Sequence, residues 1–512
     1  MITTVTVAVF VVLFAIFTAL GFGGSRWRKG NLSELGQWAL AGRTLGPYLA
    51  WFLVGADLYT AYTFISVPSA LFGVGSVYMF ATPYVMATFA VAMVTMVTLW
   101  KMSRDKGYIT GVDYVRDNFN SRTLAILIAI TGIVAELPYI ALQIVGMRSV
   151  LIVMLAPYFG GTGVAGVSET ALIISFVILA AFTFWSGLRG AALTAIMKDI
   201  IILATVVVVV IAVPLSIPGG FAYAFKQAAA TAPTIFHKNI AYATLPATLG
   251  PAYISLFILS ALQLYFYPHS INGVLSAKNV KSVRMSTAFL PLYGVGLFLL
   301  TLFGVLVYAV PEALKMVGTN GSLVVPAVIA STMPDWFTGL AFLGIFIGGL
   351  VPAAIMAIAQ ANLLTRNVIK EIKPNLTKEG ETRLVKWASV IFKFLALAFV
   401  FVVSPTYAIS LQLFGGILIA QTLPALMIGL YHKSLNKNGL IAGWAVGILS
   451  GIYFIEVANK FGQINTSLMQ SPFGLLYISA TSLILNLVIV YAWTYIAKAV
   501  SRPKIVLPAQ QA

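Results

Sequence analysis

The chain has 512 residues, of which 60% are hydrophobic and 9% charged, and its mean hydropathy is +0.97. This composition excludes a soluble globular protein and predicts a polytopic membrane protein. The formal net charge is +17 and cysteine is absent, so disulfides and thiol nucleophiles are excluded.

The first apolar segment, residues 4–22, has the length of a signal peptide. No positive residue precedes it, whereas Arg26, Arg28 and Lys29 follow it. A secretory signal has the opposite arrangement, so we expect an uncleaved helix with its N-terminus outside.

Runs of about 20 apolar residues, enough to cross a bilayer, recur along the chain. We predict thirteen transmembrane helices, with the N-terminus outside and the C-terminus inside. They cover 4–22, 46–73, 76–100, 123–156, 169–187, 191–213, 249–267, 286–310, 336–365, 385–404, 407–430, 439–458 and 473–497.

Most Lys and Arg residues fall in loops on one predicted side of the membrane. The inner loops are 26–43, 101–122, 189, 278–284, 366–386, 433–437 and 498–504, whereas the outer ones hold Arg148, Lys226, Lys238, Lys315 and Lys460. This asymmetry is the positive-inside bias of membrane proteins. It explains the net charge without a nucleic-acid partner, and the lipid bilayer is the expected surrounding.

The spans form two groups of five within one predicted transmembrane domain, 1–512. An odd number of spans reverses orientation, so homologous groups make an inverted repeat, as in many secondary transporters. The predicted parts are an extra N-terminal helix (4–22), a first repeat (46–213), a second repeat (249–430) and two extra C-terminal helices (439–497).

The first helix of each group carries residues that interrupt a membrane helix. Gly55 and the ionisable Asp57 lie inside the span 46–73, and Pro268 lies between Tyr267 and His269. An opened helix frees backbone carbonyls that can bind a cation or a substrate donor. Asp57 is expected to have a role in binding or in ion coupling, and the alternative is that it caps a half-helix.

Several separated motifs carry a family resemblance: GRTLGP at 42–47, GLRGAALTAIMKDIIIL at 187–203, YPH at 267–269 and VPAAIMAIAQANLLTRNVIKE at 351–371. Together they resemble the sodium:solute symporter family, which includes bacterial proline, galactose and sialic acid symporters. The stretches ADLYTAYTF and LYFYPHSINGVLSAKN look most like its monocarboxylate permease branch. The resemblance implies an all-α, leucine-transporter-type fold with a 5+5 inverted repeat.

The resemblance also implies a sodium site between the first and eighth core helices. Backbone carbonyls of Ala56, Tyr59 and Ala354 would contribute, with hydroxyls at the positions of Ala357 and Ile358. Neither of the last two has a side-chain oxygen. A hard cation needs several oxygen ligands, so we expect sodium binding to be severely weakened.

Lys198 stands where the family more often has Thr, and it is followed by the retained Asp199. A lysine ammonium can occupy an emptied cation site. We therefore predict proton coupling or sodium-independent exchange, with Lys198 or Asp57 as the titrating group. The alternative is that Lys198 snorkels to the inner face. No cofactor is expected, and the choice between H⁺ and Na⁺ stays open.

Polar and aromatic residues near the interrupted helices are the substrate-binding candidates. They are Tyr59, Thr60, Tyr62, Gln143, Ser260, Leu264 and Tyr267. In the proline branch, substrate-facing aromatic residues match Tyr62, Ser260 and Leu264. Only Tyr62 stays aromatic here, which favours a smaller or differently shaped solute. An interhelical hydrogen bond is the alternative for Gln143.

Glu136 and Lys393 are ionisable residues inside predicted spans, and His269 lies just after one. His269 is expected to satisfy backbone groups at the helix end, Lys393 to form an ion pair with a neighbouring helix, and Glu136 has no evident partner.

The resulting prediction is a secondary active transporter of the cell membrane that moves a small organic solute by alternating access. A monocarboxylate is the first choice of substrate, and a sodium-coupled amino acid symporter is the alternative. A channel or sensor on a transporter scaffold is the rival class. An enzyme is excluded because the histidines are scattered and no catalytic motif is present. A monomer is expected.

Overall fold

The computed structural model describes residues 2–27, 30–55, 58–160, 163–402, 408–461 and 466–500. Almost all of its elements are helices. Those before residue 250 are α1 (Thr4–Gly23), α2 (Leu35–Leu40), η1 (Ala41–Arg43), α3 (Pro47–Gly55), η2 (Tyr62–Ser66), α4 (Val67–Val74), η3 (Ser76–Phe80), α5 (Ala81–Lys106), α6 (Gly111–Phe119), α7 (Arg122–Leu155), α8 (Gly163–Ser216), α9 (Gly220–Phe236) and η4 (Ala247–Leu249).

The second half continues in the same way. Its elements are α10 (Gly250–Gln263), η5 (Leu264–Phe266), α11 (Pro268–Leu275), α12 (Val280–Ala288), α13 (Pro291–Thr301), α14 (Phe303–Leu306), η6 (Val307–Ala309), α15 (Pro311–Val317), η7 (Gly321–Leu323), α16 (Val324–Thr332), α17 (Asp335–Leu363), η8 (Leu364–Ile369), α18 (Lys370–Ile372), α19 (Lys378–Val402), α20 (Ala408–Ala420), η10 (Pro424–Ile428), α21 (Gly429–Tyr431), α22 (Lys437–Ala458), β1 (Leu468–Ser471), β2 (Gly474–Tyr477) and α23 (Ile478–Val500).

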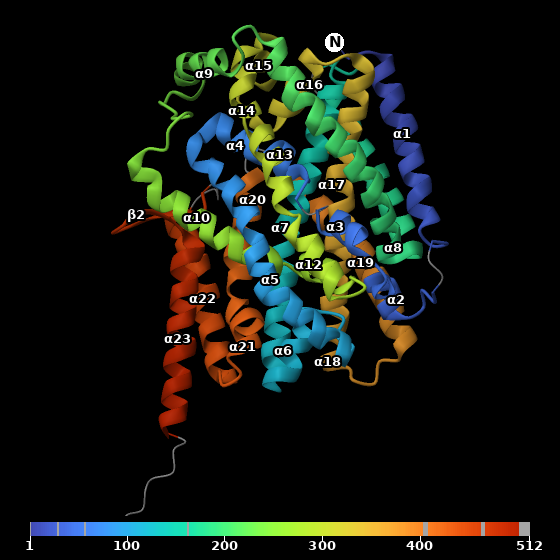
Figure 1. The fold of residues 1–512 in the computed structure, drawn as a ribbon, viewed down its shortest axis with the longest axis vertical. Helices are drawn as coiled ribbons and strands as arrows, with labels where there is room; N and C mark the ends of the chain where they lie inside the picture. The colour runs from blue at the N-terminus through green and yellow to red at the C-terminus, as the bar shows by residue number, and fades with distance from the viewer. Residues whose placement is uncertain are drawn as a thin grey trace, which may run out of the picture.

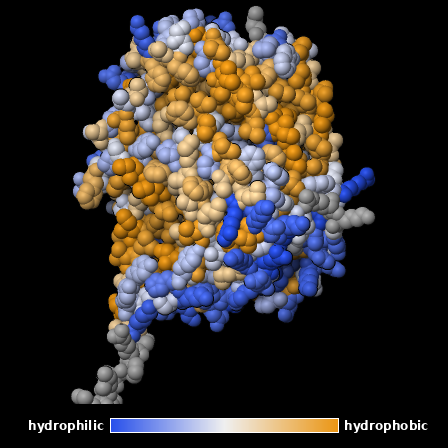
Figure 2. Space-filling view, viewed as in Figure 1, coloured by the Kyte–Doolittle hydropathy of each residue, from blue (hydrophilic) through white to orange (hydrophobic). Residues whose placement is uncertain are grey.

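The long helices run between two ends of the molecule (Figure 1). The upper end in Figure 1 carries α9, α15 and α16, and the lower end carries α6, α18 and α21. Figure 2 shows orange, hydrophobic side chains over the flank and blue, hydrophilic ones gathered at the lower end. An apolar flank with a polar end is the surface that a bilayer requires.

In the described ranges, ten helices are long and apolar enough to cross a membrane, and one bent pair raises this to eleven. The predicted polytopic membrane protein is thereby confirmed. Counting by helix length merges the predicted spans 169–187 and 191–213, because both lie in α8, which bends at Gly187 (φ 56°). It also omits the predicted span 46–73, which is divided into α3, η2 and α4.

Helix α17 is the centre of the core. The most apolar window of this span is entirely buried, whereas only 22–28% of the corresponding windows of α1, α22 and α23 is buried. Small residues let neighbouring helices come close to it. At Gly349, for example, a Cβ would lie 2.7 Å from the backbone oxygen of Gln143 on α7.

Both helices predicted to be interrupted are broken. The first stops at Gly55 and resumes as a π-helix at Tyr62. The second stops at Gln263, passes through the 3₁₀ turn η5 and an extended Tyr267 (φ −61°, ψ 137°), and resumes at Pro268. Proline fits the first turn of a helix because its missing N–H is not needed there.

Candidate functional site

The break in the first helix leaves backbone groups that side chains satisfy. The amide of Ala61 donates to Gln143 Oε1 (3.1 Å), and that of Tyr62 donates to Thr60 Oγ1 (3.0 Å). The hydroxyl of Thr63 donates to the carbonyl of Leu58. An open membrane helix needs such partners because the bilayer core offers no water.

The carbonyl of Tyr59 in this break receives the ammonium of Lys198. Lys198 Nζ lies 3.2 Å from the Tyr59 oxygen and 2.7 Å from Asp199 Oδ1. Lys198 and Asp199 are both fully buried on α8. The snorkelling alternative is therefore wrong, because the ammonium ends in the protein core beside the opened helix.

Two tyrosines complete this cluster. Tyr293 on α13 donates from its hydroxyl to Asp199 Oδ2 (3.3 Å). Its ring meets that of Tyr59 edge to face, with centroids 4.5 Å apart. Helix α13 comes close enough for this contact at Gly296, where a Cβ would lie 1.9 Å from Tyr59 Oη. The ammonium is thus balanced by one carboxylate and held by a backbone carbonyl.

The positions carried over from the sodium site lie on both sides of this space. Ala354, Ala357 and Ile358 are fully buried on α17. Helices α8 and α17 run antiparallel here. A Cβ on Gly344 of α17 would lie near Thr205 of α8, whereas a Cβ on Gly348, later in α17, would lie near Ile202, earlier in α8. Lys198, one turn before Ile202, is thus level with the turn of α17 that ends at Ala354. Ala56 and Asp57 lie outside the described residues.

The second broken helix holds a hydrogen-bond partner that the sequence analysis missed. His269 Nδ1 is hydrogen-bonded with Glu136 Oε1 of α7, and both side chains are fully buried. His269 was expected to satisfy backbone groups and Glu136 had no assigned partner. Glu136 lies inside a predicted span and His269 just after one. This was the available signal, because intramembrane ionisable groups usually pair with one another.

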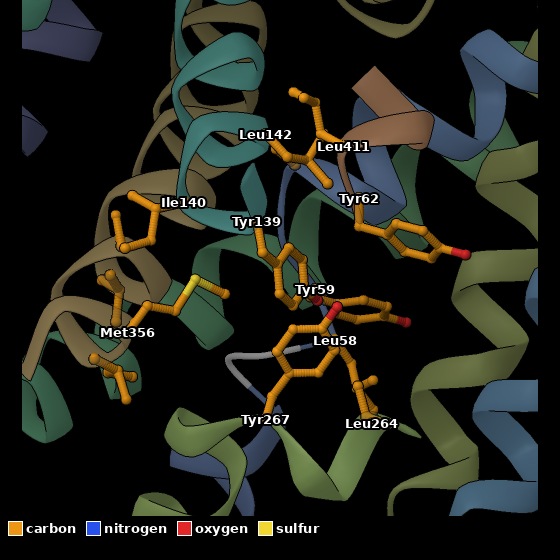
Figure 3. Packing of buried hydrophobic residues seen from close by; sticks show 14 of the residues in the cluster. Leu58, Tyr59, Tyr62, Tyr139, Ile140, Leu142, Leu264, Tyr267, Met356 and Leu411 are labelled. Carbon is orange, nitrogen blue, oxygen red and sulfur yellow. The ribbon is translucent and has the colours of Figure 1, made fainter. Parts of the chain in front are cut away.

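Aromatic side chains gather between α7 and the second break. The rings of Tyr139 and Tyr267 lie 5.3 Å apart, and each lies within 5.6 Å of the His269 ring. Figure 3 shows Tyr139 and Tyr267 turned toward each other, with Leu264 on the adjoining turn. The hydroxyl of Tyr267 donates to the Gln412 carbonyl of α20 (3.2 Å). This cluster joins α7, the second broken helix and α20.

The remaining substrate candidates have distinct environments. Gln143 bonds to backbone at both ends of its amide, with Nε2 donating to the Tyr139 carbonyl (3.4 Å), so it makes the interhelical bond given as its alternative. Tyr62 packs against Tyr84 of α5, with centroids 6.0 Å apart. Ser260 is buried, and its hydroxyl has no hydrogen-bond partner among the residues described.

Lys393 differs from the prediction made for it. Its ammonium is fully buried and contacts Ser389 one turn earlier on the same helix, 2.7 Å from Oγ and 3.3 Å from the carbonyl. The predicted ion pair with a neighbouring helix is absent from the described part of the chain. Lysine can fold back in this way because its four-carbon stem is flexible.

Known proteins resemble this chain over most of its length. It is 39% identical to a monocarboxylate transport permease protein of Rhizobium johnstonii over 479 residues, covering 92% of this chain and 94% of the relative. It is 34% identical to the uncharacterized symporter YodF of Bacillus subtilis, with 89% of both chains covered. The sodium/pantothenate symporter of Escherichia coli is 26% identical, covering 81% of this chain and 83% of the relative.

A solved structure has the same fold. A substrate-bound, outward-open Na⁺-coupled sialic acid symporter superimposes with a TM-score of 0.74 at 14% identity, covering 96% of this chain and 98% of the other. The family model of the sodium:solute symporter family matches residues 38–447. The relatives are membrane transporters and not enzymes. This chain belongs to the sodium:solute symporter family and is a multi-pass solute symporter of the cell membrane.

Proposed function

We propose that this symporter carries a small monocarboxylate and that the ammonium of Lys198 takes the place of a coupling sodium ion. The observation that carries the proposal is the contact of Lys198 Nζ with the Tyr59 carbonyl in the open helix. That carbonyl is one of the oxygens expected to bind sodium. A second cation at this point would meet the repulsion of a buried ammonium.

Two features of the site support a coupling step that moves protons. The ammonium contacts the carbonyl of Tyr59 and the carboxylate of Asp199, and the positions of Ala357 and Ile358 add no side-chain oxygen. Loss of the proton from Lys198, or gain of one by Asp199, removes the buried pair and changes which conformation of the open helix is stable. Asp57 stays a second candidate for the titrating group.

The substrate choice rests on the 39% identical permease and on the chemistry near the second break. The hydroxyl of Ser260 is buried and available as a donor for a carboxylate. The hydroxyl groups of Tyr62 and Tyr267 add polar atoms to surroundings that are otherwise apolar. Leu264 stands where the proline branch has an aromatic residue, and this substitution favours a short aliphatic acid over a ring.

The proposed topology has thirteen crossings, with the N-terminus outside and the C-terminus inside. Helix α8 has two parts, one on either side of Gly187, and each is counted as one crossing. The divided first core helix is counted as a further crossing. Predicted helices 2, 3, 7 and 8 form a bundle that rocks against helices 4, 5, 9 and 10. Each group of five begins with a broken helix, as expected for an inverted repeat of 46–213 and 249–430.

The test is uptake of labelled pyruvate into proteoliposomes under separately imposed sodium and proton gradients. We expect a proton gradient to drive uptake without sodium, and Lys198→Ala to abolish this dependence. Lys393→Ala removes another buried lysine and is expected to leave the coupling unchanged. Uptake driven by sodium at fixed pH and insensitive to Lys198→Ala contradicts the proposal.

The same vesicles distinguish the rival functions. Saturable counterflow of pyruvate identifies a carrier, whereas leak without counterflow identifies a channel. Competition by amino acids in place of lactate supports the sodium-coupled amino acid symporter instead.

A further inference from the structure

At the end of the molecule where the basic residues gather, two distant chain segments lie side by side. Residues 42–45 lead into α3, and residues 276–279 lead into α12. Leu45 and Ala277 form a parallel bridge, in which the amide of Leu45 donates to Ser276 (3.3 Å) and that of Lys278 donates to Leu45 (2.7 Å). The last turns of α5 pack beside them, since Trp100 Nε1 donates to the Ala277 carbonyl (3.0 Å).

An open pocket between these segments is lined by three cations. Arg43, Arg104 and Lys278 face it, together with Trp100 and Asn279, and no carboxylate belongs to its lining. None of the three cations forms an ion pair with a carboxylate in the part of the chain that the structure describes. This differs from the neighbouring surface, where Lys106 pairs with Asp117.

The two guanidinium groups are fixed close to each other. Arg43 donates to the carbonyls of Leu275 and Ser103, both at 3.2 Å, and Arg104 lies 5.3 Å from the centre of the Trp100 ring. Burial and the charge of Arg104 lower the pKa of Arg43, against a smaller opposite effect of Asp113. An anion between the guanidinium groups would relieve their repulsion.

An apolar groove lies along the helices that these segments begin. It is lined by Tyr48 and Trp51 of α3, by Met285 of α12 and by Phe289 and Leu292 near the start of α13. Three of these side chains are strongly exposed: Tyr48 at 72%, Leu292 at 58% and Phe289 at 49%. No charged residue lines the groove.

The pocket and the groove are consecutive parts of one surface. Thr44 lines the pocket and Pro47 lines the groove, three residues later. On the other side, Asn279 lines the pocket and caps α12, which leads to Phe289. Ten helical residues rise about 15 Å, close to the depth of one leaflet of the hydrocarbon core. Figure 2 shows the same order on a larger scale, with a hydrophilic lower end below the hydrophobic flank.

We propose that this surface binds one anionic phospholipid, with its headgroup phosphate among Arg43, Arg104 and Lys278 and an acyl chain in the groove between α3 and α13. The all-cationic pocket favours a headgroup with net negative charge, because the ammonium of a zwitterionic headgroup would meet three cations. The groove selects a lipid over free phosphate, since only a lipid fills both parts.

The test measures lipid binding to the purified full-length chain in detergent. Native mass spectrometry and thermal unfolding are recorded with dioleoyl phosphatidylglycerol and with dioleoyl phosphatidylcholine. We expect phosphatidylglycerol to bind more tightly and to raise Tm more. Arg104→Gln with Lys278→Gln lowers the affinity about 25-fold, because each cation near an anionic lipid contributes about fivefold. Arg43 is kept because it also holds backbone carbonyls.

Matched variants and probes distinguish a specific lipid site from nonspecific attraction between the lipid and positive charge. Lys373→Gln with Lys378→Gln removes the same charge from two exposed positions, one after α18 and one at the start of α19, and is expected to change nothing. Leu292→Trp fills the groove, keeps all three cations and is expected to weaken lipid binding as well. The proposal is overturned if the two double variants lose the same lipid affinity. It is also overturned if Leu292→Trp keeps full lipid affinity. So does a Tm shift of the same size with inorganic phosphate or glycerophosphoglycerol.

Discussion

At the scale of single residues, one side chain decides what can occupy the space beside the Tyr59 carbonyl. An ammonium on a flexible stem needs only a few acceptors, and its charge is supplied by the chain instead of by the solution. Lys198 has the Tyr59 carbonyl at 3.2 Å and the Asp199 carboxylate at 2.7 Å. A sodium ion has to be surrounded by oxygen atoms, and the side chains of Ala357 and Ile358 supply none.

This contrast predicts a gain of function. Lys198→Ala combined with Ala357→Ser and Ile358→Ser removes the ammonium and restores two hydroxyls. We expect uptake by this triple variant to become sodium-dependent, with a stimulation of about tenfold, equivalent to about 1.4 kcal/mol. Lys198→Ala alone is expected to be inactive and insensitive to sodium, because the oxygens are still missing.

The control for the triple variant is Lys393→Ala with the same two serines. It has the same change of charge and hydroxyl number but keeps the Lys198 ammonium in the site. We expect no response to sodium from it. A folded triple variant that transports without sodium dependence would show that the space is not a cation site.

At the scale of helices, α17 is held against α7 by a backbone contact that a side chain would disrupt. A Cβ on Gly349 would lie 2.7 Å from the carbonyl oxygen of Gln143. We therefore predict that Gly349→Ala lowers the free energy of unfolding by about 1–3 kcal/mol, the usual range for overpacking. Because Gln143 also holds the Ala61 amide, uptake should fall as well. Unfolding by added SDS in mixed micelles measures the first effect, and pyruvate uptake the second.

Gly344→Ala is the matched control on the same helix. Its Cβ would meet the methyl group Cγ2 of Ile201 at 3.1 Å and not a carbonyl. A side chain can shift by a few tenths of an ångström, so a smaller loss is expected. Equal losses for the two variants would contradict the role given to the backbone contact.

The breaks in these helices could be predicted from the sequence, because glycine, a carboxyl group and proline inside apolar spans each oppose a continuous membrane helix. Lys198 was placed beside the first break only through a family resemblance. The Glu136–His269 pair was missed, since partners 133 positions apart are not visible in local periodicity. Helix α9 and the β1–β2 hairpin were also missed. Helix α9 lies between the predicted spans 191–213 and 249–267, and β2 lies at the start of the predicted span 473–497, where an apolar run was assigned to a helix.

At the scale of the whole molecule, a network of charged residues connects the two predicted repeats. It lies at the end of the molecule where the basic residues gather. Asp113 of α6 accepts from Arg366 (3.4 Å) and from Asn367 (2.8 Å) of η8. Arg366 also bonds to Glu381 of α19 (3.2 Å), which in turn pairs with Lys370. The side chains of Asp113 and Glu381 are only 10% and 4% exposed. Low exposure strengthens such pairs by reducing solvent screening.

A double-mutant cycle tests whether this network couples the repeats. We expect the losses of stability in Asp113→Ala and Arg366→Ala to add up to more than the loss in the double variant, with a coupling of about 1–3 kcal/mol. Asp113 also forms a capping box with Thr110 at the start of α6. The loss of this cap is common to both Asp113→Ala branches of the cycle and cancels. The comparison pair is Lys106 and Asp117, whose side chains are 55% and 47% exposed. Its coupling should stay below about 1 kcal/mol, the usual value for surface pairs. Equal coupling in the two cycles would mean that the contact between α6 and η8 acts as an ordinary surface pair, and the link between the repeats would then depend on apolar packing alone.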